Sequence, residues 1–343
     1  MSSDAPFDPG APSAAGSGIF GLPFGPDDSR VHLIPVPFEA TTSYRQGTAR
    51  GPEAILTASH QIDLFDLETE RPYEAGIYFH PIPAEIISLD VEARPLAEQV
   101  IESFGEEPTS HVRHALQRVN ECGARVNEWV KAEVTRALAA DRLVGVIGGD
   151  HSVPFGAIAA HLEKYPEMGI LHLDAHADLR DAFEGFTWSH ASIFHNVYSK
   201  LGRPRLVQVG IRDMSEDELR FQEASRGRIT AHFGPELSRQ KLEGVAFSHL
   251  AERIVSELPE HVYVSFDIDG LDPAFCPNTG TPVPDGLTFA EATYLLREIA
   301  DSGRKIVGFD LCEVAPGEEL DGWDAIVGAR ILYKLIGFAL QSQ

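Results

Sequence analysis

One run of the sequence, "LHLDAHADLR" (171–180), places acidic residues and histidine at alternating positions. Asp174, His176 and Asp178 stand at every second residue, with alanine between them. Because side chains alternate between the two faces of an extended strand, these three side chains are expected to share one face. Two carboxylates and an imidazole within reach of one another are ligands that divalent cations bind. The run therefore predicts part of a metal site.

Two further runs supply candidate ligands of the same kind. His151 lies in "GGDHS" at the end of an apolar run, and "SFDIDGLDP" presents Asp267 and Asp269 in one phase. With the first run, the candidate metal ligands are His151, Asp174, His176, Asp178, Asp267 and Asp269. A single ion cannot use six protein ligands and still admit water and substrate, whereas two ions bridged by shared carboxylates can. This oxygen-rich set favours Mn²⁺ or a similar divalent metal over structural zinc, and Ni²⁺ or Co²⁺ stay open alternatives.

Each run alone has a simpler explanation, since Asp and His are common in the turns that follow strands. The three runs together are harder to explain in that way. Four carboxylates gathered at one sheet edge would repel one another and raise one another's pKa values unless a cation neutralised them. We therefore favour a metal centre over turn chemistry as the explanation for the combination.

Short apolar segments alternate with helical patterns along the chain. Most of these segments are rich in Val, Ile and Leu in both phases, as in parallel strands that helices cover on both faces. We expect strands at 31–38, 143–149, 169–175, 205–211, 261–269 and 305–314. We expect helices near 51–60, 112–140, 153–164, 215–225, 247–258, 288–302 and 324–341. The alternation predicts an α/β fold with a mainly parallel sheet, in which the carboxyl ends of the strands gather the candidate ligands.

The chain is expected to form a single domain. Residues 1–26 are rich in Pro, Gly, Ala and Ser and are expected to be a flexible N-terminal tail, and 27–343 would be the α/β domain. Residues 80–110 contain four prolines and interrupt the alternation of strands and helices. We expect an insertion or an irregular connection there.

Composition excludes several classes of function. Asp and Glu number 52 against 28 Lys and Arg, a net charge of −24, which argues against nucleic acid as a partner because phosphate binding needs basic clusters. The sequence contains no run of about 18 apolar residues, so it predicts no membrane span. Three unpaired cysteines and an N-terminus without signal-peptide features favour a reducing, cytoplasmic location.

The same motifs resemble the ureohydrolase family, which includes arginase, agmatinase and guanidinobutyrase. "GGDHS", "DAHAD" and "SFDIDGLDP" occur in the order typical of that family, and "TTSYRQGTARGPEAI", "WSHASIF" and "FDLCEVAP" extend the resemblance over nearly the whole chain from Val31. The resemblance implies a three-layer α/β/α fold, a binuclear Mn²⁺ centre held by the six candidate ligands, and hydrolysis of a guanidino compound that releases urea. It also implies a homo-oligomer, a trimer or a hexamer.

The resemblance also implies roles for residues outside the ligand set. Glu313 would pair with the N–H groups of the planar guanidinium, as a carboxylate can, and His190 would protonate the leaving amine, as a histidine that titrates near neutral pH can. Asp150 and Asp310 are candidates for groups that orient metal-bound imidazoles. Three other histidines lack such a context and are expected to be packed or surface residues: His161, His172 and His195.

The substrate is predicted from the segment between "DAHAD" and His190. The asparagine and the Ser–Asn pair with which arginine-specific relatives read the amino-acid end of their substrate are replaced here, with Arg180 and Asp181 at the first position. We therefore expect agmatine, cleaved to putrescine and urea. If Arg180 faces the cleft, guanidinobutyrate or another small guanidino or formimino compound is the alternative.

Two other classes are weaker interpretations of the same motifs. A one-zinc deacetylase of related fold would need an extra histidine pair and fewer carboxylates. A non-catalytic metal-binding relative would usually have lost a ligand or the glutamate, and this chain has lost neither.

Overall fold

The described residues form an eight-stranded, all-parallel sheet in a computed structural model that describes residues 7–13, 16–105 and 107–343. The strands are β1 (Val31–Val36), β2 (Ile77–Phe79), β3 (Leu143–Gly148), β4 (Gly169–Leu173), β5 (Leu206–Val209), β6 (Ile229–His232), β7 (His261–Asp267) and β8 (Lys305–Cys312). Their order across the sheet is β2-β1-β3-β8-β7-β4-β5-β6. This confirms the predicted parallel α/β fold.

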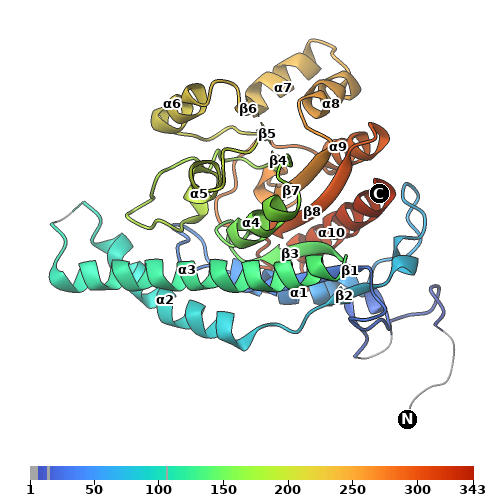
Figure 1. The fold of residues 1–343 in the computed structure, drawn as a ribbon, viewed down its shortest axis with the longest axis horizontal. Coiled ribbons are helices and arrows are strands. Elements are labelled where there is room, and N and C mark those ends of the chain that lie inside the picture. The colour runs from blue at the N-terminus through green and yellow to red at the C-terminus, as the bar shows by residue number, and fades with distance from the viewer. Residues whose placement is uncertain (1–6, 14–15, 106) are drawn as a thin grey trace.

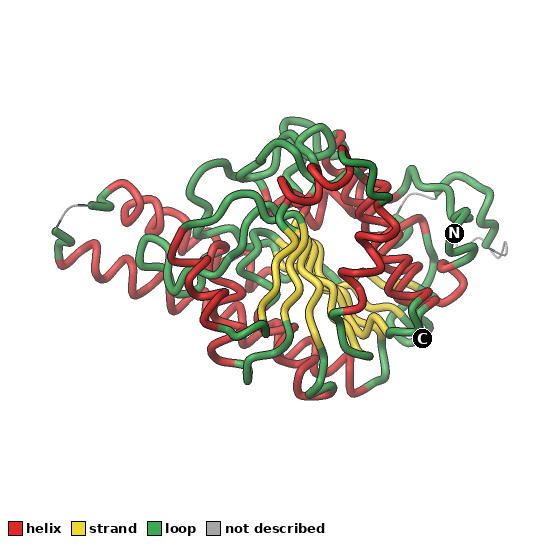
Figure 2. Tube along the Cα trace, turned by 90° about the horizontal axis from the view of Figure 1, so that it is seen from above, coloured by secondary structure: helices red, strands yellow, loops and turns green. Residues whose placement is uncertain are grey.

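Helices cover both faces of the sheet, so that the sheet is the middle of three layers (Figures 1 and 2). They are α1 (Gly51–Ser59), α2 (Ala84–Glu102), α3 (Ser110–Ala139), α4 (Phe155–Lys164), α5 (Ile193–Lys200), α6 (Glu216–Ala224), α7 (Gly234–Leu242), α8 (Phe247–Ser256), α9 (Phe289–Asp301) and α10 (Trp323–Gln341). Within the described part of the chain, no helix combines the length and the apolar character that a membrane crossing requires.

Two apolar cores lie between these layers. Along β3, Val144 and Val146 belong to the core under α3 and α4, whereas Leu143 and Ile147 belong to the core under α1 and α10. Every residue of β3 is buried. Burial on both faces explains why the strands are apolar in both phases and why the sequence predicted them well.

Short elements escaped the sequence analysis. Strands β2 and β6 have only three and four residues, and neither was expected. Helices α5 and α7 have eight and nine residues, and neither was expected. The six predicted strands and seven predicted helices are present with ends that differ by one to two residues.

The segment 80–110 holds a regular helix rather than an irregular connection. Helix α2 follows Pro83, the residue before its first turn, and contains Pro95 in its interior. It runs beside the 30-residue helix α3, and the two form a hairpin that projects from the body of the molecule (Figure 1). A third, small core holds the hairpin to the rest, through residues such as Val100, Val119 and Phe186. The expectation that this segment is an insertion stays a prediction.

The predicted N-terminal tail is shorter than 26 residues. Part of it, 1–6 and 14–15, lies outside the described residues. Ile19, Phe20 and Leu22 are buried against the core that contains α1 and α10, and the Phe20 ring lies 4.7 Å from that of Tyr333. Because these three side chains are apolar and packed, the folded domain begins before residue 27.

Candidate metal centre

The candidate site residues follow four neighbouring strands in the middle of the sheet. Strands β3, β8, β7 and β4 are adjacent in that order. His151 follows β3, Glu313 follows β8, Asp267 ends β7, and Asp174 follows β4. All strands are parallel, so these residues meet at one edge of the sheet, the edge at which open α/β sheets place their ligands.

The turn after β3 has room only for glycine at its second position. A side chain at Gly149 would collide with the backbone carbonyl of Phe38. The N–H of Asp150 donates a hydrogen bond to that carbonyl (2.9 Å), which holds the turn against the chain after β1. The next residue, His151, is thereby directed over the edge of the sheet, where it is buried.

Strand β4 ends earlier than expected, and a turn brings its acidic residues together. The strand stops at Leu173, so the alternation of Asp174, His176 and Asp178 does not arise from one continuous strand, as the sequence had suggested. Asp174 Oδ1 accepts the N–H of His176 (2.6 Å), and Asp178 adopts a left-handed backbone with φ of 55°. Such strained backbone is common at functional sites. The turn brings the side chains of Asp174, His176 and Asp178 closer together than a continuous strand would.

Three carboxylates converge on one nitrogen of His151. Its Nδ1 atom lies 3.0 Å from Asp174 Oδ2, 3.1 Å from Asp178 Oδ2 and 3.3 Å from Asp267 Oδ2. All four side chains are at least 94% buried. His151, Asp174 and Asp178, together with His172, form the first group of side chains whose ligand atoms could surround one cation, and Asp267 adjoins this group.

A second group forms on the other side of Asp174. His176 Nδ1 lies 3.4 Å from Asp174 Oδ1 and 3.1 Å from Asp269 Oδ2. Asp174 therefore contributes one oxygen to each group, Oδ2 to the first and Oδ1 to the second. The structure brings the six candidate ligands together: five belong to two groups that share Asp174, and Asp267 adjoins the first group through His151.

Burial of so many acidic groups makes the site unfavourable without a cation. Burial, with the neighbouring charge of Asp174, raises the pKa of Asp178 to about 7, and burial, with Asp269 next, raises that of Asp267 well above its usual range. Burial also opposes ionisation of Asp174, but the surrounding histidines hold its pKa well below normal. A divalent cation would stabilise all of these carboxylates in the ionised form. The donor set, two imidazoles and four carboxylates, fits a pair of divalent ions.

His172 is a site residue that the sequence analysis missed. It was expected to be an ordinary packed or surface histidine, but its Nε2 lies 2.7 Å from Asp174 Oδ2, and it belongs to the first group of potential ligands. Gln208, from the neighbouring strand β5, donates to His172 Nδ1 (2.9 Å). His172 stands two residues before Asp174, so in an extended strand both side chains point to the same face. This spacing could have identified His172 as a neighbour of the site.

Asp310 and Asp150 differ in their relation to the imidazoles. Ser265 Oγ donates to Asp310 (2.9 Å) and lies 3.0 Å from His151 Nε2, so Asp310 acts on His151 through a serine that the sequence analysis did not single out. The Asp150 carboxylate accepts bonds from the N–H and hydroxyl of Ser152. Its described contacts fix the turn after β3 and do not include an imidazole.

Glu313 and His190 make different contacts beside the ligand groups. Glu313 is 6% exposed, its Oε1 accepts the N–H of His151 (2.9 Å), and its backbone is left-handed with φ of 63°. His190 begins a short 3-10 helix and has a buried Nδ1 atom without a hydrogen-bond partner. Burial, with the charges of His176 and His151, lowers the pKa of His190 to about 4, below the near-neutral value that its expected role assumed.

A cavity of about 160 Å³ is lined by one residue from each ligand group, Asp178 from the first and His176 from the second. Its lining residues are Ser43, His176, Asp178, Arg180, Phe183, His190, Ala191, Asp213, Glu218 and Thr281. Arg180 lines it, with Nε 3.5 Å from the buried Glu218 carboxylate and its guanidinium 4.9 Å from the centre of the Phe183 ring. Asp181 is 93% exposed, lies 3.5 Å from His195 Nδ1, and is not part of the lining.

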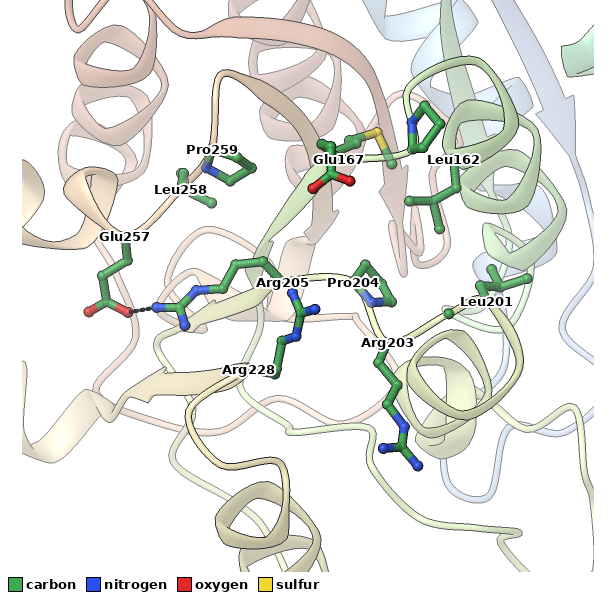
Figure 3. A pocket seen from close by; sticks show the side chains of 13 residues that line it. Leu162, Glu167, Leu201, Arg203, Pro204, Arg205, Arg228, Glu257, Leu258 and Pro259 are labelled. Carbon is green, nitrogen blue, oxygen red and sulfur yellow. Dashed lines mark hydrogen bonds and ion pairs between the residues drawn. The ribbon is translucent and has the colours of Figure 1, made fainter.

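A second cavity, of about 330 Å³, lies at the opposite edge of the sheet (Figure 3). It is lined by residues that precede β4, β5 and β7, including Met168, Arg205 and Pro259. The Arg205 guanidinium is paired with Glu257 at 2.7 Å (Figure 3). None of the candidate ligands lines this cavity.

Comparison with known proteins agrees with this geometry. The sequence matches the family description "Arginase family" over residues 29–337. An N(1)-aminopropylagmatine ureohydrolase of Thermus thermophilus is 34% identical over 322 residues, which cover 93% of this chain and 94% of the relative. An agmatinase of Bacillus cereus is 29% identical over 310 residues, covering 90% and 92%. The solved structure of proclavaminate amidinohydrolase from Streptomyces clavuligerus has a TM-score of 0.72 at 26% identity and covers 97% of this chain and 100% of that one.

Proposed function

The chain belongs to the arginase family, and we propose that it hydrolyses guanidines that carry a cationic amine at the far end, with agmatine as its substrate and putrescine and urea as products. Its relatives are hydrolases that act on amidino C–N bonds, and this chain is a ureohydrolase of the same family acting on guanidino compounds. The single observation that carries the finer proposal is the position of the two ligand groups beneath a cavity that also contains Asp213 and Glu218.

Two divalent ions would be held by the six candidate ligands, with Asp174 shared between them and Mn²⁺ as the expected metal. His172 stands close enough to Asp174 to orient the shared carboxylate. When bound, such ions lower the pKa of the water that attacks the guanidinium carbon and stabilise the charge that develops there. His151 is kept in place from the other side by Ser265 and Asp310.

Glu313 and His190 would act on the substrate itself. In the hydrolysis, a C–O bond forms at the guanidinium carbon, its C–N bond to the substrate chain breaks, and the leaving nitrogen takes a proton. A carboxylate such as Glu313 pairs with guanidinium N–H groups and orients the carbon. Neutral His190, whose unpartnered Nδ1 is one buried polar atom of the cavity wall, would accept the proton released by water and pass it to the leaving amine.

The cavity lining supports an amine rather than a carboxylate at the far end of the substrate. Arg180, the main reason to consider guanidinobutyrate, lies against Glu218, so its positive charge is largely compensated. Asp213 adds a further exposed carboxylate to the lining. A cationic tail would therefore enter an acidic cavity, whereas a carboxylate tail would be repelled.

A longer amine-tailed guanidine is the second candidate. The Thermus thermophilus relative carries the name of an N(1)-aminopropylagmatine ureohydrolase, and that compound also ends in an amine. Both substrates share the cationic tail, and the two differ in the length of the chain that carries it. Guanidinobutyrate remains the alternative with the opposite charge.

A substrate comparison tests the proposal. We expect kcat/KM of the manganese-loaded protein to be at least about tenfold higher for agmatine or N(1)-aminopropylagmatine than for 4-guanidinobutyrate, because one misplaced charge is worth 1.4 kcal/mol or more. Arginine should be a poor substrate, since its α-carboxylate finds no partner. Release of urea is the readout. A preference for 4-guanidinobutyrate that disappears in Arg180→Ala would contradict the proposal and support guanidinobutyrase.

Two further expectations stay predictions, one from the resemblance and one from the composition. These are assembly of the chain into a trimer or hexamer and a location in the cytoplasm. Sedimentation of the purified protein would test the first, and its distribution between fractions of the source cells would test the second.

A further inference from the structure

One face of α2 carries three polar residues that all contact the same loop. Asp90, Arg94 and Glu98 are spaced four residues apart, which places them in a row on a helix. Each contacts residues 39–48, here called the cavity loop, which connects β1 to α1. Building on the proposed function, we propose that Arg94 is a positioning residue of the active site and that α2 holds the cavity loop closed over the bound guanidine.

Arg94 makes the central contacts. Its Nη1 donates to Thr42 O at 2.7 Å and to Thr42 Oγ1 at 2.8 Å, and Ala40 O lies at 3.3 Å. Its side chain is 15% exposed. Thr42 and Ala40 are buried, so without Arg94 their carbonyl groups would lose a charged donor in a place with little access to water.

Asp90 and Glu98 extend the same contact along the loop. Asp90 Oδ1 accepts the N–H of Glu39 at 2.7 Å. Glu98 Oε1 accepts from Gln46 Nε2 at 3.0 Å and from Arg94 Nε at 3.3 Å. The loop is thus held near its start, in its middle and near its end by one helix face.

The cavity loop reaches the site with two hydroxyl residues. Ser43 lines the cavity beside His190 and Arg180. Thr41 Oγ1 lies 3.4 Å from Asp150 Oδ2 and accepts the N–H of His190 at 3.4 Å. A shift of the loop would therefore move one wall of the cavity and release the backbone of the proposed proton donor.

Apart from α2, the loop is held by Arg45, whose Nη1 donates to Pro277 O at 2.8 Å, and by Glu39. Glu39 Oε2 accepts the N–H groups of Gly47 and Thr48, both at 2.7 Å, which ties the two ends of the loop together. The residues between Thr42 and Gly47 are exposed. The α2–α3 hairpin therefore supports the loop as well as packing on the fold, because α2 adds contacts at Thr42 and Gln46 on either side of the exposed residues.

Comparison of Arg94→Ala with Arg118→Ala distinguishes loss of the loop contacts from a general loss of hairpin stability. Arg118 lies on α3 and pairs with Glu92 of α2 at 2.5 Å and with Glu121 at 3.0 Å, so it supports the same hairpin without contacting the cavity loop. Arg94→Lys serves as the conservative variant, since a lysine ammonium could still donate to Thr42.

The first readout does not depend on activity. The exposed Arg45 lies in the cavity loop and is a site for trypsin. We expect the appearance of the fragment that ends at Arg45 to be about tenfold faster in Arg94→Ala than in the wild type, because a lost charge-assisted hydrogen bond is worth roughly a factor of ten in loop opening. Arg118→Ala should be cut at the wild-type rate, and Arg94→Lys at an intermediate rate.

The second readout is the division of the effect between KM and kcat. In Arg94→Ala we expect KM for agmatine to rise about tenfold with metal content unchanged, because the cavity wall is displaced while the ligands are not. The proposal would be overturned if Arg94→Ala left both cutting at Arg45 and KM as in the wild type, or changed only one of them. It would also be overturned if Arg118→Ala changed the cutting rate and KM as much as Arg94→Ala does. If the wild type releases no urea from any guanidine, the proposed function fails, and the trypsin result still decides whether Arg94 holds the loop.

Discussion

Replacing Asp174 with asparagine is expected to abolish release of urea. Asp174 is the one residue that places a carboxylate oxygen in each of the two ligand groups. Asparagine keeps the size of the side chain but removes the charge, so both proposed ions lose a ligand. Because metal ions contribute several kcal/mol to such a reaction, we expect kcat to fall roughly 10³-fold or more.

The same substitution should alter metal content and stability. Bound metal stabilises the folded state, so the wild type is expected to gain Tm with Mn²⁺ and Asp174→Asn to gain less. Asp181→Asn is the matched control, since Asp181 is an exposed aspartate of the same segment outside the cavity lining. Wild-type activity and metal content in Asp174→Asn would show that the shared carboxylate is not a ligand.

His190→Ala should slow turnover without loss of metal. Proton transfer by a positioned histidine contributes about 10²–10⁴-fold to a rate, and kcat should fall by a factor in this range. His190 lines the cavity and is not a member of either ligand group. Elemental analysis should therefore find the same metal content as in the wild type.

His195 provides the control for this prediction. It is five residues away, pairs with Asp181 and lies outside the cavity lining. His195→Ala is expected to retain turnover within about threefold, as a substitution outside the site should. Loss of metal from His190→Ala would mean that His190 is a ligand, and an unchanged kcat would mean that another group protonates the amine.

The candidate ligands could be found in the sequence because the information is local. His151, Asp174 and Asp267 each follow or end a buried apolar strand within a few residues, and parallel strands deliver their carboxyl ends to one edge. The fold could be predicted for the same reason, since both faces of most strands are buried. What was not predictable was the turn after Leu173, in which the left-handed Asp178 replaces a continued strand.

Other features depend on contacts between distant segments. Ser265 of β7 joins Asp310 of β8 to His151, which follows β3, because β8 lies between β7 and β3 in the sheet. Glu218 compensates Arg180 across 38 residues, and Arg94 reaches Thr42 across 52. A periodic pattern in one segment carries no record of such partners, so the sequence could name Arg180 as a specificity candidate but could not say which charge faces it.

Titration of the metal-free protein with Mn²⁺, followed by release of urea from agmatine, tests the central claim most directly. The two ligand groups share Asp174, and six ligands exceed the need of one ion. We predict that the rate of urea release rises until two equivalents of Mn²⁺ per chain are bound and then becomes constant. A break at one equivalent with full activity, or no urea at any metal content, would contradict the account.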